Sequence, residues 1–186
     1  MRSPALADGE LDQLTLARAQ RGDDRACRAL VECYQRRVFA LLSRFGVRAR
    51  IDDLAQDTFL RVFRALPGWS PSGPARLSTW ILTIATRLAL DEVRRRPATT
   101  APLDDTIPSG ARADEPSERA ALGRAIERAV RALTPDHQAV FLLREYHGLE
   151  YDEIARALDS DSGTVKSRLS RARAALREAL AEVRHE

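Results

Sequence analysis

The sequence is poor in the residues that build redox and metal centres, with two cysteines and three histidines among 186 residues. Cys27 and Cys33 are six positions apart in a predicted helix, so their side chains point in different directions around its axis and we expect no disulfide between them. The histidines are scattered and have no zinc-ligand spacing with the two thiols (His137, His147 and His185). We therefore expect no metal and no cofactor.

The chain also lacks long apolar runs and the residue patterns of catalytic sites. No run approaches the ~18 apolar residues that cross a bilayer, and the first residues, MRSPALADGELDQL, contain no apolar segment of the signal-peptide kind. There is no Ser/His/Asp or Cys/His arrangement and no phosphate-binding loop. These absences predict a cytoplasmic protein that does not insert into membranes and is not an enzyme, with no catalytic residues.

Alternating β-strand patterns are lacking as well, and Gly and Pro lie almost only at the ends of predicted elements, so we expect an all-α fold. Residues 97–117 contain four prolines, no aromatic residue, and four acids against one arginine. Such a segment cannot bury enough apolar surface to offset the entropy lost on ordering. The sequence predicts two small helical domains, 10–96 and 118–183, joined by a flexible acidic linker at 97–117.

Four helices are predicted in each half from the apolar spacing and from the Gly and Pro residues that end them. In the first half they cover 10–21, 23–45, 51–66 and 77–95. In the second half they cover 117–132, 135–146, 151–158 and 163–183. The net charge is only +3 although the isoelectric point is about 9.3. The basic character is therefore local, which fits a protein that touches nucleic acid in places.

The last predicted helix carries the clearest functional pattern. Between Gly163 and Arg177 there are five cations and no acid. The cations are Lys166, Arg168, Arg171, Arg173 and Arg177. The apolar residues that recur along one helix face are Val165, Leu169, Ala172 and Leu176. A basic helix after a short helix and a turn is typical of a helix-turn-helix that enters the major groove of DNA. The alternative is a solvated basic face that the helix dipole favours.

The third and fourth predicted helices each have two faces. In the third, Ala55, Phe59, Val62 and Leu66 are expected to face inward and Asp53, Gln56, Asp57 and Leu60 outward. The outward face could be plain solvent surface or a docking surface for a basic partner helix. In the fourth, Trp80, Ile84 and Leu88 are expected in the core and Thr83, Thr86, Arg87, Leu90 and Arg94 outside. Together with a loop that carries Trp69, this cationic surface suits single-stranded DNA.

The chain resembles the extracytoplasmic-function (ECF) group of bacterial sigma factors in the order of its motifs. These are DDLAQDTFLRVFRALPGW, STWILTIATRLALDEVRRR, the Pro-rich acidic linker, LTPDHQAVFLLREYHGLEYDEIARAL and GTVKSRLSRARAALR. The resemblance covers about residues 12–96 and 118–180. It implies a promoter-recognition subunit whose first half holds the polymerase clamp and reads the −10 element as melted, flipped bases. The second half, with its helix-turn-helix, reads the −35 element as duplex.

The resemblance also implies partners and site residues. The implied partners are core RNA polymerase (the clamp coiled coil of its largest subunit, and its flap), promoter DNA and an anti-sigma factor. The implied polymerase-binding residues are Asp53, Gln56, Asp57 and Leu60. The implied −10 residues are Trp69, Ser70, Trp80, Thr83, Arg87 and Arg94. The implied −35 residues are Arg144, Tyr151, Asp152, Lys166, Ser167, Ser170 and Arg171.

Three features depart from the family pattern. Arg87 stands where the family often has an Asn that contacts a −10 base, so the −10 preference is expected to differ. The loop that carries Trp69 is about one residue longer than usual. The common turn Gly-Val-Pro-Val is replaced by residues 159–162, Asp-Ser-Asp-Ser. We therefore expect weaker or altered −35 binding, not its loss.

The sequence leaves two alternatives to a sigma factor. A conventional helix-turn-helix regulator would act without polymerase association, but the first half has no ligand-binding or phospho-acceptor pattern and carries its own arginine-rich helix beside a Trp-bearing loop. An anti-sigma-type or structural adaptor would not need two separate basic helices that face DNA. Polymerase dependence separates the regulator from the sigma factor, because a repressor binds its duplex alone.

Overall fold

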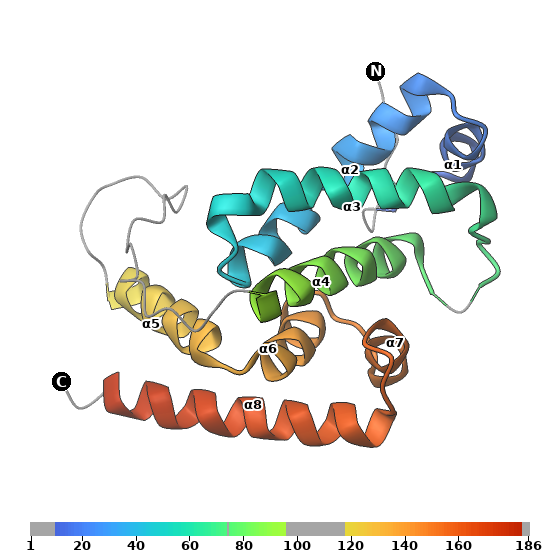
Figure 1. Ribbon diagram of the computed structural model, residues 1–186. Helices are drawn as coiled ribbons and strands as arrows, with labels where there is room; N and C mark the ends of the chain where they lie inside the picture. The colour runs from blue at the N-terminus through green and yellow to red at the C-terminus, as the bar shows by residue number, and fades with distance from the viewer. Residues whose placement is uncertain (1–9, 74, 96–117, 184–186) are drawn as a thin grey trace.

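The computed structural model describes residues 10–73, 75–95 and 118–183, and these residues form helices joined by short turns (Figure 1). The first half contains α1 (Gln13–Gln20), α2 (Asp24–Arg44), α3 (Ile51–Ala65) and α4 (Leu77–Arg95), with 3₁₀ turns at Arg48–Arg50 and Leu66–Gly68. The second half contains α5 (Glu118–Ala132), α6 (Pro135–Phe141), α7 (Tyr151–Ala157) and α8 (Ser162–Val183). The all-α prediction is confirmed.

The first two helices begin at aspartate caps. The Asp12 and Asp23 carboxylates accept hydrogen bonds from the backbone N–H groups of Thr15 and Ala26, each at 2.9 Å. Such bonds satisfy N–H donors that a helix start otherwise leaves without partners. Between the two helices Gly22 has φ +81°, a conformation that favours glycine. The sequence at 12–26 therefore specifies a tight connection from α1 to α2.

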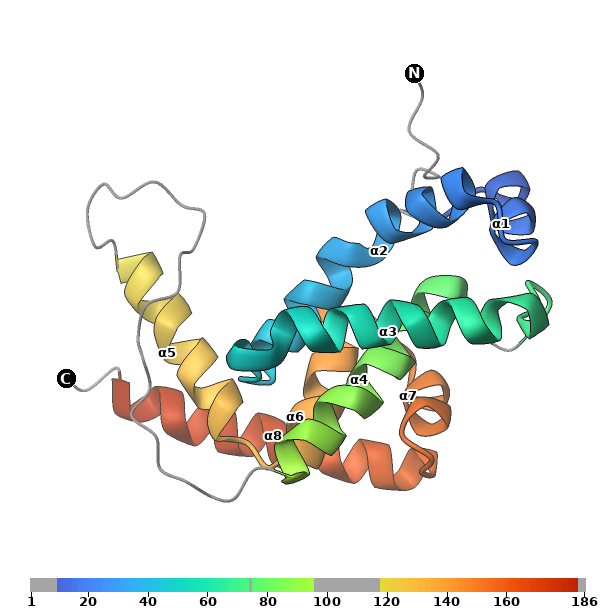
Figure 2. The same ribbon diagram turned by 45° about the horizontal axis from the view of Figure 1, so that its top comes forward.

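The core of the first half forms where α2, α3 and α4 pack against one another. Figure 1 shows α3 crossing in front of α2 with α4 below them, and Figure 2 shows the same three helices with the top of the molecule turned forward. Tyr34 on α2 is buried, and its hydroxyl accepts from Leu11 N–H at 3.0 Å and donates to the Glu10 carboxylate at 2.9 Å. This pair of bonds holds the segment before α1 against α2.

Helix α4 lies at the centre of the molecule, and part of its predicted orientation is wrong. Thr86 and Leu90 were expected outside but are buried, whereas Trp80 and Ile84 were expected in the core and are half-buried. The reason is that α4 packs on α2 and α3 on one side and on α6 and α7 on the other. A helix covered on two sides has no single apolar stripe. Thr86 is tolerated there because its hydroxyl donates to the Leu82 carbonyl at 2.8 Å.

In the second half α5, α6 and α7 pack on α8, the long helix along the base of Figure 1. The four residues predicted for its apolar face are all buried: Val165, Leu169, Ala172 and Leu176. The predicted regular helix 135–146 is wrong beyond Phe141, because Leu142–Tyr146 forms a π-helical turn. This turn places two consecutive residues, Leu142 and Leu143, fully in the core.

The two halves lie against each other within the described residues. Helix α4 contacts α6 and α7, and α2 contacts α5. Figure 2 shows α4 and α7 side by side above α8. The predicted linker at 97–117 falls outside the described residues, so the division into domains at 96 and 118 stays a prediction.

Candidate nucleic-acid interface

Helices α7 and α8 form a helix-turn-helix. After α7, Asp159 takes a left-handed conformation with φ +50°, and the N–H of Ser160 donates to the Ala155 carbonyl at 2.9 Å. The Asp161 carboxylate then accepts from the backbone N–H of Thr164 at 2.7 Å and from its hydroxyl at 2.6 Å. These bonds hold the pKa of the Asp161 carboxyl below its usual value. The polar turn that departs from the family pattern therefore caps α8 with an aspartate.

The structure brings together the predicted −35 residues at the start of the two helices. The Arg144 guanidinium lies 5.0 Å from the Tyr151 ring centroid, and the Lys166 ammonium lies 5.8 Å from the same centroid. A cation over an aromatic face is attracted by the ring quadrupole. Asp152 accepts a hydrogen bond from the Ser162 hydroxyl, which ties α7 to the first turn of α8.

The remaining predicted −35 residues follow along the exposed side of α8. Ser167, Ser170 and Arg171 are all exposed, and the Ser167 hydroxyl donates to the Thr164 carbonyl at 3.0 Å. A serine bound to its own helix in this way still has oxygen lone pairs for another partner. Lys166 is exposed on the same stretch. This stretch of α8 offers cationic and hydroxyl groups to a partner.

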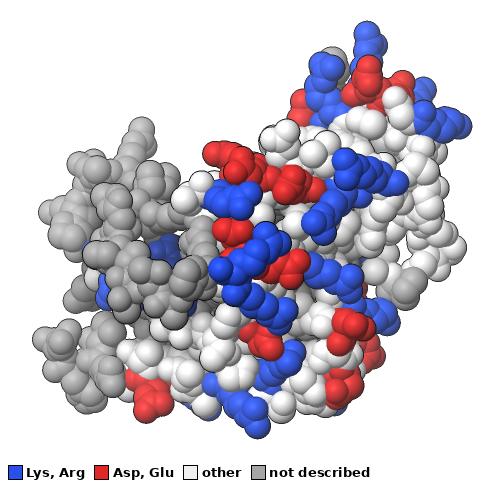
Figure 3. Space-filling view, viewed as in Figure 1, with Lys and Arg blue, Asp and Glu red and all other residues white. Residues whose placement is uncertain are grey.

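Two of the five cations on α8 face other parts of the protein. Arg168 pairs with Asp136 at 3.1 Å, and Arg173 pairs with Glu145 at 2.5 Å. Asp136 belongs to α6 and Glu145 to the π turn, so acids from elsewhere in the sequence lie beside two cations of a stretch that has no acid of its own. In Figure 3 the Lys and Arg side chains form a band across this view that is interleaved with Asp and Glu.

An aromatic pocket lies where the loop before α4 meets the first turn of that helix. The Trp69 and Trp80 rings have centroids 6.3 Å apart and planes tilted by 38°. They line a cavity of about 360 Å³. The remaining lining residues are Ala65, Gly68, Ser70, Gly73 and Ala75. Three predicted −10 residues, Trp69, Ser70 and Trp80, thus share one open, partly apolar site.

The other predicted −10 residues lie further along α4 and not in this pocket. Arg87 is seven residues beyond Trp80, or about 10 Å along the helix axis. Its guanidinium donates to the carbonyl oxygens of Ala157 at 2.9 Å and Arg156 at 3.2 Å, at the end of α7. Arg94 pairs with Asp136 at 2.7 Å. Both arginines therefore bind the second half of the chain in this arrangement.

Thr83 lies between the aromatic pocket and Arg87 on α4. It is half-buried, and its hydroxyl donates to the Thr79 carbonyl at 2.9 Å. Because the hydroxyl proton is used in this bond, Thr83 presents a methyl group and no free hydrogen-bond donor on the helix surface.

The outward face of α3 is exposed, as the sequence predicted. Asp53, Gln56 and Asp57 are exposed, and Leu60 is 44% exposed. Their spacing places them on one side of the helix, because residues three and four apart are neighbours. Asp53 lies 3.5 Å from the Arg50 guanidinium. An acidic stripe that ends in an exposed leucine suits a basic partner helix with an apolar contact.

Sequence reasoning missed Gln20, the last residue of α1. Its side-chain amide donates to the Leu66 carbonyl at 3.1 Å and to the Trp69 carbonyl at 2.7 Å. The partners are more than forty positions away in sequence, with separations of 46 and 49. No local pattern marks such a residue, since only the tertiary fold brings α1 to the loop.

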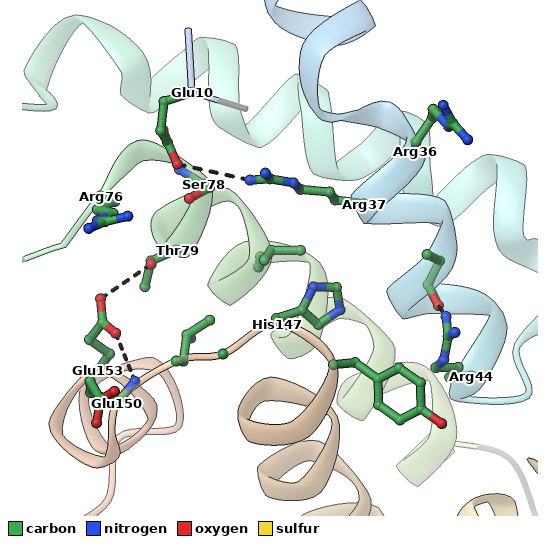
Figure 4. A pocket seen from close by; sticks show the side chains of 15 residues that line it. Glu10, Arg36, Arg37, Arg44, Arg76, Ser78, Thr79, His147, Glu150 and Glu153 are labelled. Atoms are coloured by element: carbon green, nitrogen blue, oxygen red, sulfur yellow. Dashed lines mark hydrogen bonds and ion pairs between the residues drawn. The ribbon is translucent and has the colours of Figure 1, made fainter. Parts of the chain in front are cut away.

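Sequence reasoning also missed the environment of His147. It lies at a cleft of about 760 Å³ between the halves, beside Arg37 and Arg44 of α2 (Figure 4). Burial and these two cations lower the pKa of His147 to about 4. The imidazole is therefore neutral near pH 7.

Among residues 10–73, 75–95 and 118–183, no group of three or more His, Cys, Asp or Glu side chains could hold a metal ion. No helix there is long and apolar enough to cross a membrane.

The two halves match separate parts of one protein family. Residues 30–99 match the family described as sigma-70 region 2, and residues 123–176 match sigma-70 region 4. The first match contains α3, α4 and the Trp69 loop, and the second contains the helix-turn-helix.

Curated relatives match almost the whole chain. The ECF RNA polymerase sigma-E factor of Escherichia coli (strain K12) is 32% identical over 177 residues, which cover 89% of this chain and 92% of that protein. The RNA polymerase sigma-H factor of Pseudomonas aeruginosa (strain PAO1) is 34% identical over 184 residues, which cover 92% of this chain and 94% of that protein.

Solved structures share the fold. CnrH, solved in complex with the cytosolic domain of CnrY, has a TM-score of 0.68 and 25% identity, covering 92% of this chain and 97% of that chain. The sigma factor RpoE of Bartonella quintana, solved with the anti-sigma factor NepR, has a TM-score of 0.64 and 22% identity. The match covers 83% of this chain and 96% of that chain. The second likeness shows the fold alone.

Proposed function

The chain belongs to the extracytoplasmic-function (ECF) sigma factors, and from that membership we propose how its residues divide the work of promoter recognition. An alternative sigma factor binds core RNA polymerase, directs it to specific promoters and assists their melting. The observation that carries the proposal is that one chain has two separate surfaces suited to DNA. One is the Trp69–Trp80 pocket, and the other is the helix-turn-helix with Lys166 and Arg171.

We propose that α8 enters the major groove of the −35 element. Lys166 and Arg171 would donate to guanine edges or phosphates, and Ser167 and Ser170 would reach bases or phosphates. Arg144, Tyr151 and Asp152 would support the first turn of α8 from α7 and the π turn. Two observations support this placement of α8. Its residues Lys166, Ser167, Ser170 and Arg171 are exposed, and Arg144 and Lys166 pack on the Tyr151 ring.

We propose that the −10 element is read in the first half as unpaired bases. The pocket between Trp69 and Trp80 would accept an unstacked base, with Ser70 at its rim, because aromatic faces stack on any base. Thr83, Arg87 and Arg94 would follow the strand along α4. The two arginines first have to leave their partners in the second half.

The polymerase would bind along the outward face of α3. Asp53, Gln56, Asp57 and Leu60 present two carboxylates, an amide and an exposed apolar side chain on one stripe. A basic coiled coil with an apolar seam, such as the clamp of the largest subunit, matches that stripe in charge and shape. We also propose contact of the second half with the flap, and control by an anti-sigma factor that covers these surfaces.

Run-off transcription tests the proposal. Purified core polymerase is incubated with genomic promoter fragments, with and without this protein. We expect discrete transcripts only when the protein is present, because core enzyme alone does not choose start sites. Tight duplex binding by the free chain, with no effect on polymerase, would instead support a conventional helix-turn-helix regulator.

A further inference from the structure

One side chain from α1 spans the turn that leads into the aromatic pocket. The Gln20 amide nitrogen has two N–H donors, and its two contacts go to the carbonyl at the start of the 3₁₀ turn, Leu66, and to the carbonyl just after it, Trp69. The backbone N–H of Trp69 also donates to the Leu66 carbonyl at 3.1 Å. Gln20 thus joins both ends of the turn.

The bridge starts from a rigid base. Gln20 is the last residue of α1, which the Asp12 cap holds at one end and the Gly22 turn holds at the other. The N–H of Gly22 donates to the Ala19 carbonyl at 3.0 Å, and the N–H of Asp23 donates to the Arg18 carbonyl at 3.1 Å. A side chain anchored in this way transmits the position of α1 to its partners.

The turn that Gln20 holds decides where the Trp69 ring lies. Leu66 is buried at the end of α3, whereas Trp69 is half-buried and leaves the turn in an extended conformation with ψ 136°. Its carbonyl lies one residue before the exposed Ser70. The donor at that carbonyl ties the chain after the turn to α1, in addition to the bond from the Trp69 N–H to the Leu66 carbonyl and the ring contact with Trp80.

We propose that Gln20 is a positioning residue for the aromatic pocket, which holds the Trp69 ring against Trp80 so that one unstacked base of single-stranded DNA fits the cavity that the two rings line. This role rests on the proposed function of that pocket. Gln20 does not touch the base itself. It holds the pocket in the open form before DNA arrives, which lowers the entropy cost of binding.

The test uses two changes at this position. Gln20→Leu removes both N–H donors at similar size, and Gln20→Glu keeps the length but puts a carboxylate against two carbonyl oxygens. Gln13→Leu is the matched control, because it makes the same chemical change at an exposed residue of the same helix. The sequence contains two tryptophans, and both line this pocket. Tryptophan fluorescence of the free protein therefore reports on the pocket alone.

Two readouts separate positioning from a general loss of structure. In the free protein, acrylamide should quench tryptophan emission more strongly in both Gln20 variants than in the wild type or the Gln13→Leu control. In holoenzyme with a premelted −10 fork that carries 2-aminopurine at the flipped position, affinity should fall about 5-fold, as expected for one or two lost hydrogen bonds. Discrimination between bases at that position should fall too, while −35 duplex binding and core binding stay unchanged.

The outcomes are distinct. Gln20 variants with wild-type quenching and wild-type base discrimination would overturn the positioning role while leaving the proposed function intact. A loss of −35 or core binding equal to the loss at the fork would also overturn it, because that pattern indicates unfolding. If wild-type holoenzyme gives no 2-aminopurine response at any position, the pocket does not bind a base, and both proposals fail.

Discussion

The imidazole of His147 lies in the cleft between the two halves, which is lined by residues of α2, of α4 and of the segment between the π turn and α7. It follows the π turn and shares the cleft with Arg37 and Arg44 of α2, of which Arg37 points toward Glu10 (Figure 4). Its Nε2 atom is buried and has no hydrogen-bond partner among the described residues. Burial of the imidazole is the main reason why its pKa lies at about 4, and the Arg44 and Arg37 cations lower it further.

This environment predicts a pH dependence of stability. The pKa is lower in the folded chain than the ordinary value of 6.5, so the unfolded chain binds the proton more tightly between these values. The contribution of the neutral His147 imidazole to the free energy of unfolding is fully present above pH 6.5 and is lost as the pH drops toward 4. Between pH 7 and pH 5 we expect a loss of about 2 kcal/mol in the free energy of unfolding, measured by urea denaturation.

A His147→Gln variant provides the control. It cannot titrate in this range, so its free energy of unfolding should change far less between pH 7 and pH 5. His137→Gln should keep the wild-type slope. Equal slopes in the wild type and the His147→Gln variant would show that other groups carry the pH dependence.

At the level of elements, helix α8 has one face that packs in the core and an opposite face that we propose binds DNA. The buried residues Leu169 and Ala172 attach it to α5, α6 and α7, while Lys166 and Arg171 remain exposed. Lys166→Glu with Arg171→Glu should abolish −35-dependent transcription and leave core binding intact, because reversed charge repels the DNA backbone. In vitro transcription from promoters with and without the −35 element measures this.

The matched control for α8 is Arg124→Glu with Arg128→Glu. It makes the same charge change at two exposed residues of α5 in the same half. Promoter output should remain near wild type in that variant. Unchanged output from the α8 variant would remove Lys166 and Arg171 from the proposed −35 surface.

Helix α3 likewise divides into a buried face and an acidic face. Asp53→Arg reverses charge at an exposed position of the acidic face and should weaken core polymerase binding by at least about 5-fold, in line with measured couplings of interfacial charge pairs. Glu32→Arg, at an exposed residue of α2, should have little effect. Pull-down titration with core enzyme compares the two, and equal binding by both would reject the α3 docking face.

At the scale of the whole molecule, one carboxylate lies at the seam between the two halves and pairs with two arginines. Asp136 of α6 pairs with Arg94 of α4 at 2.7 Å and with Arg168 of α8 at 3.1 Å. In the same seam Gln138 donates to the Arg44 carbonyl at 2.8 Å. The pairs at Asp136 are partly exposed, so each contributes only about 0–1 kcal/mol. The ion pair between Asp136 and Arg94 therefore adds little to the apolar packing of α4 on α6 and α7.

Asp136→Asn tests this seam. It removes the charge that pairs with Arg94 across the seam, so the halves should separate more often, and the radius of gyration from small-angle X-ray scattering should rise. Asp91→Asn, at an exposed residue of α4 beside the same seam, is the matched control and should leave the radius unchanged. A compact Asp136→Asn variant would show that other contacts hold the halves together.

Most of the elements could be predicted from sequence because their signals are local. The apolar spacing of α3 and α8 places Val62 and Leu169 in the core, and Asp161 with Ser162 marks the start of α8. The motifs of both halves indicate the sigma-factor family for the same reason, since each lies within one helix pair. The residues proposed to bind DNA and polymerase follow from the resemblance to that family, and their roles stay predictions.

What the tertiary structure decided concerns contacts between distant segments. It buries Thr86 and Leu90, because α4 is covered on two sides. It turns Arg168 toward Asp136, which comes from another helix. It joins Gln20 to a loop 49 residues away. A periodic pattern shows that a helix has an apolar face, but which neighbour covers that face, and which charges meet there, depends on packing that no local sequence contains.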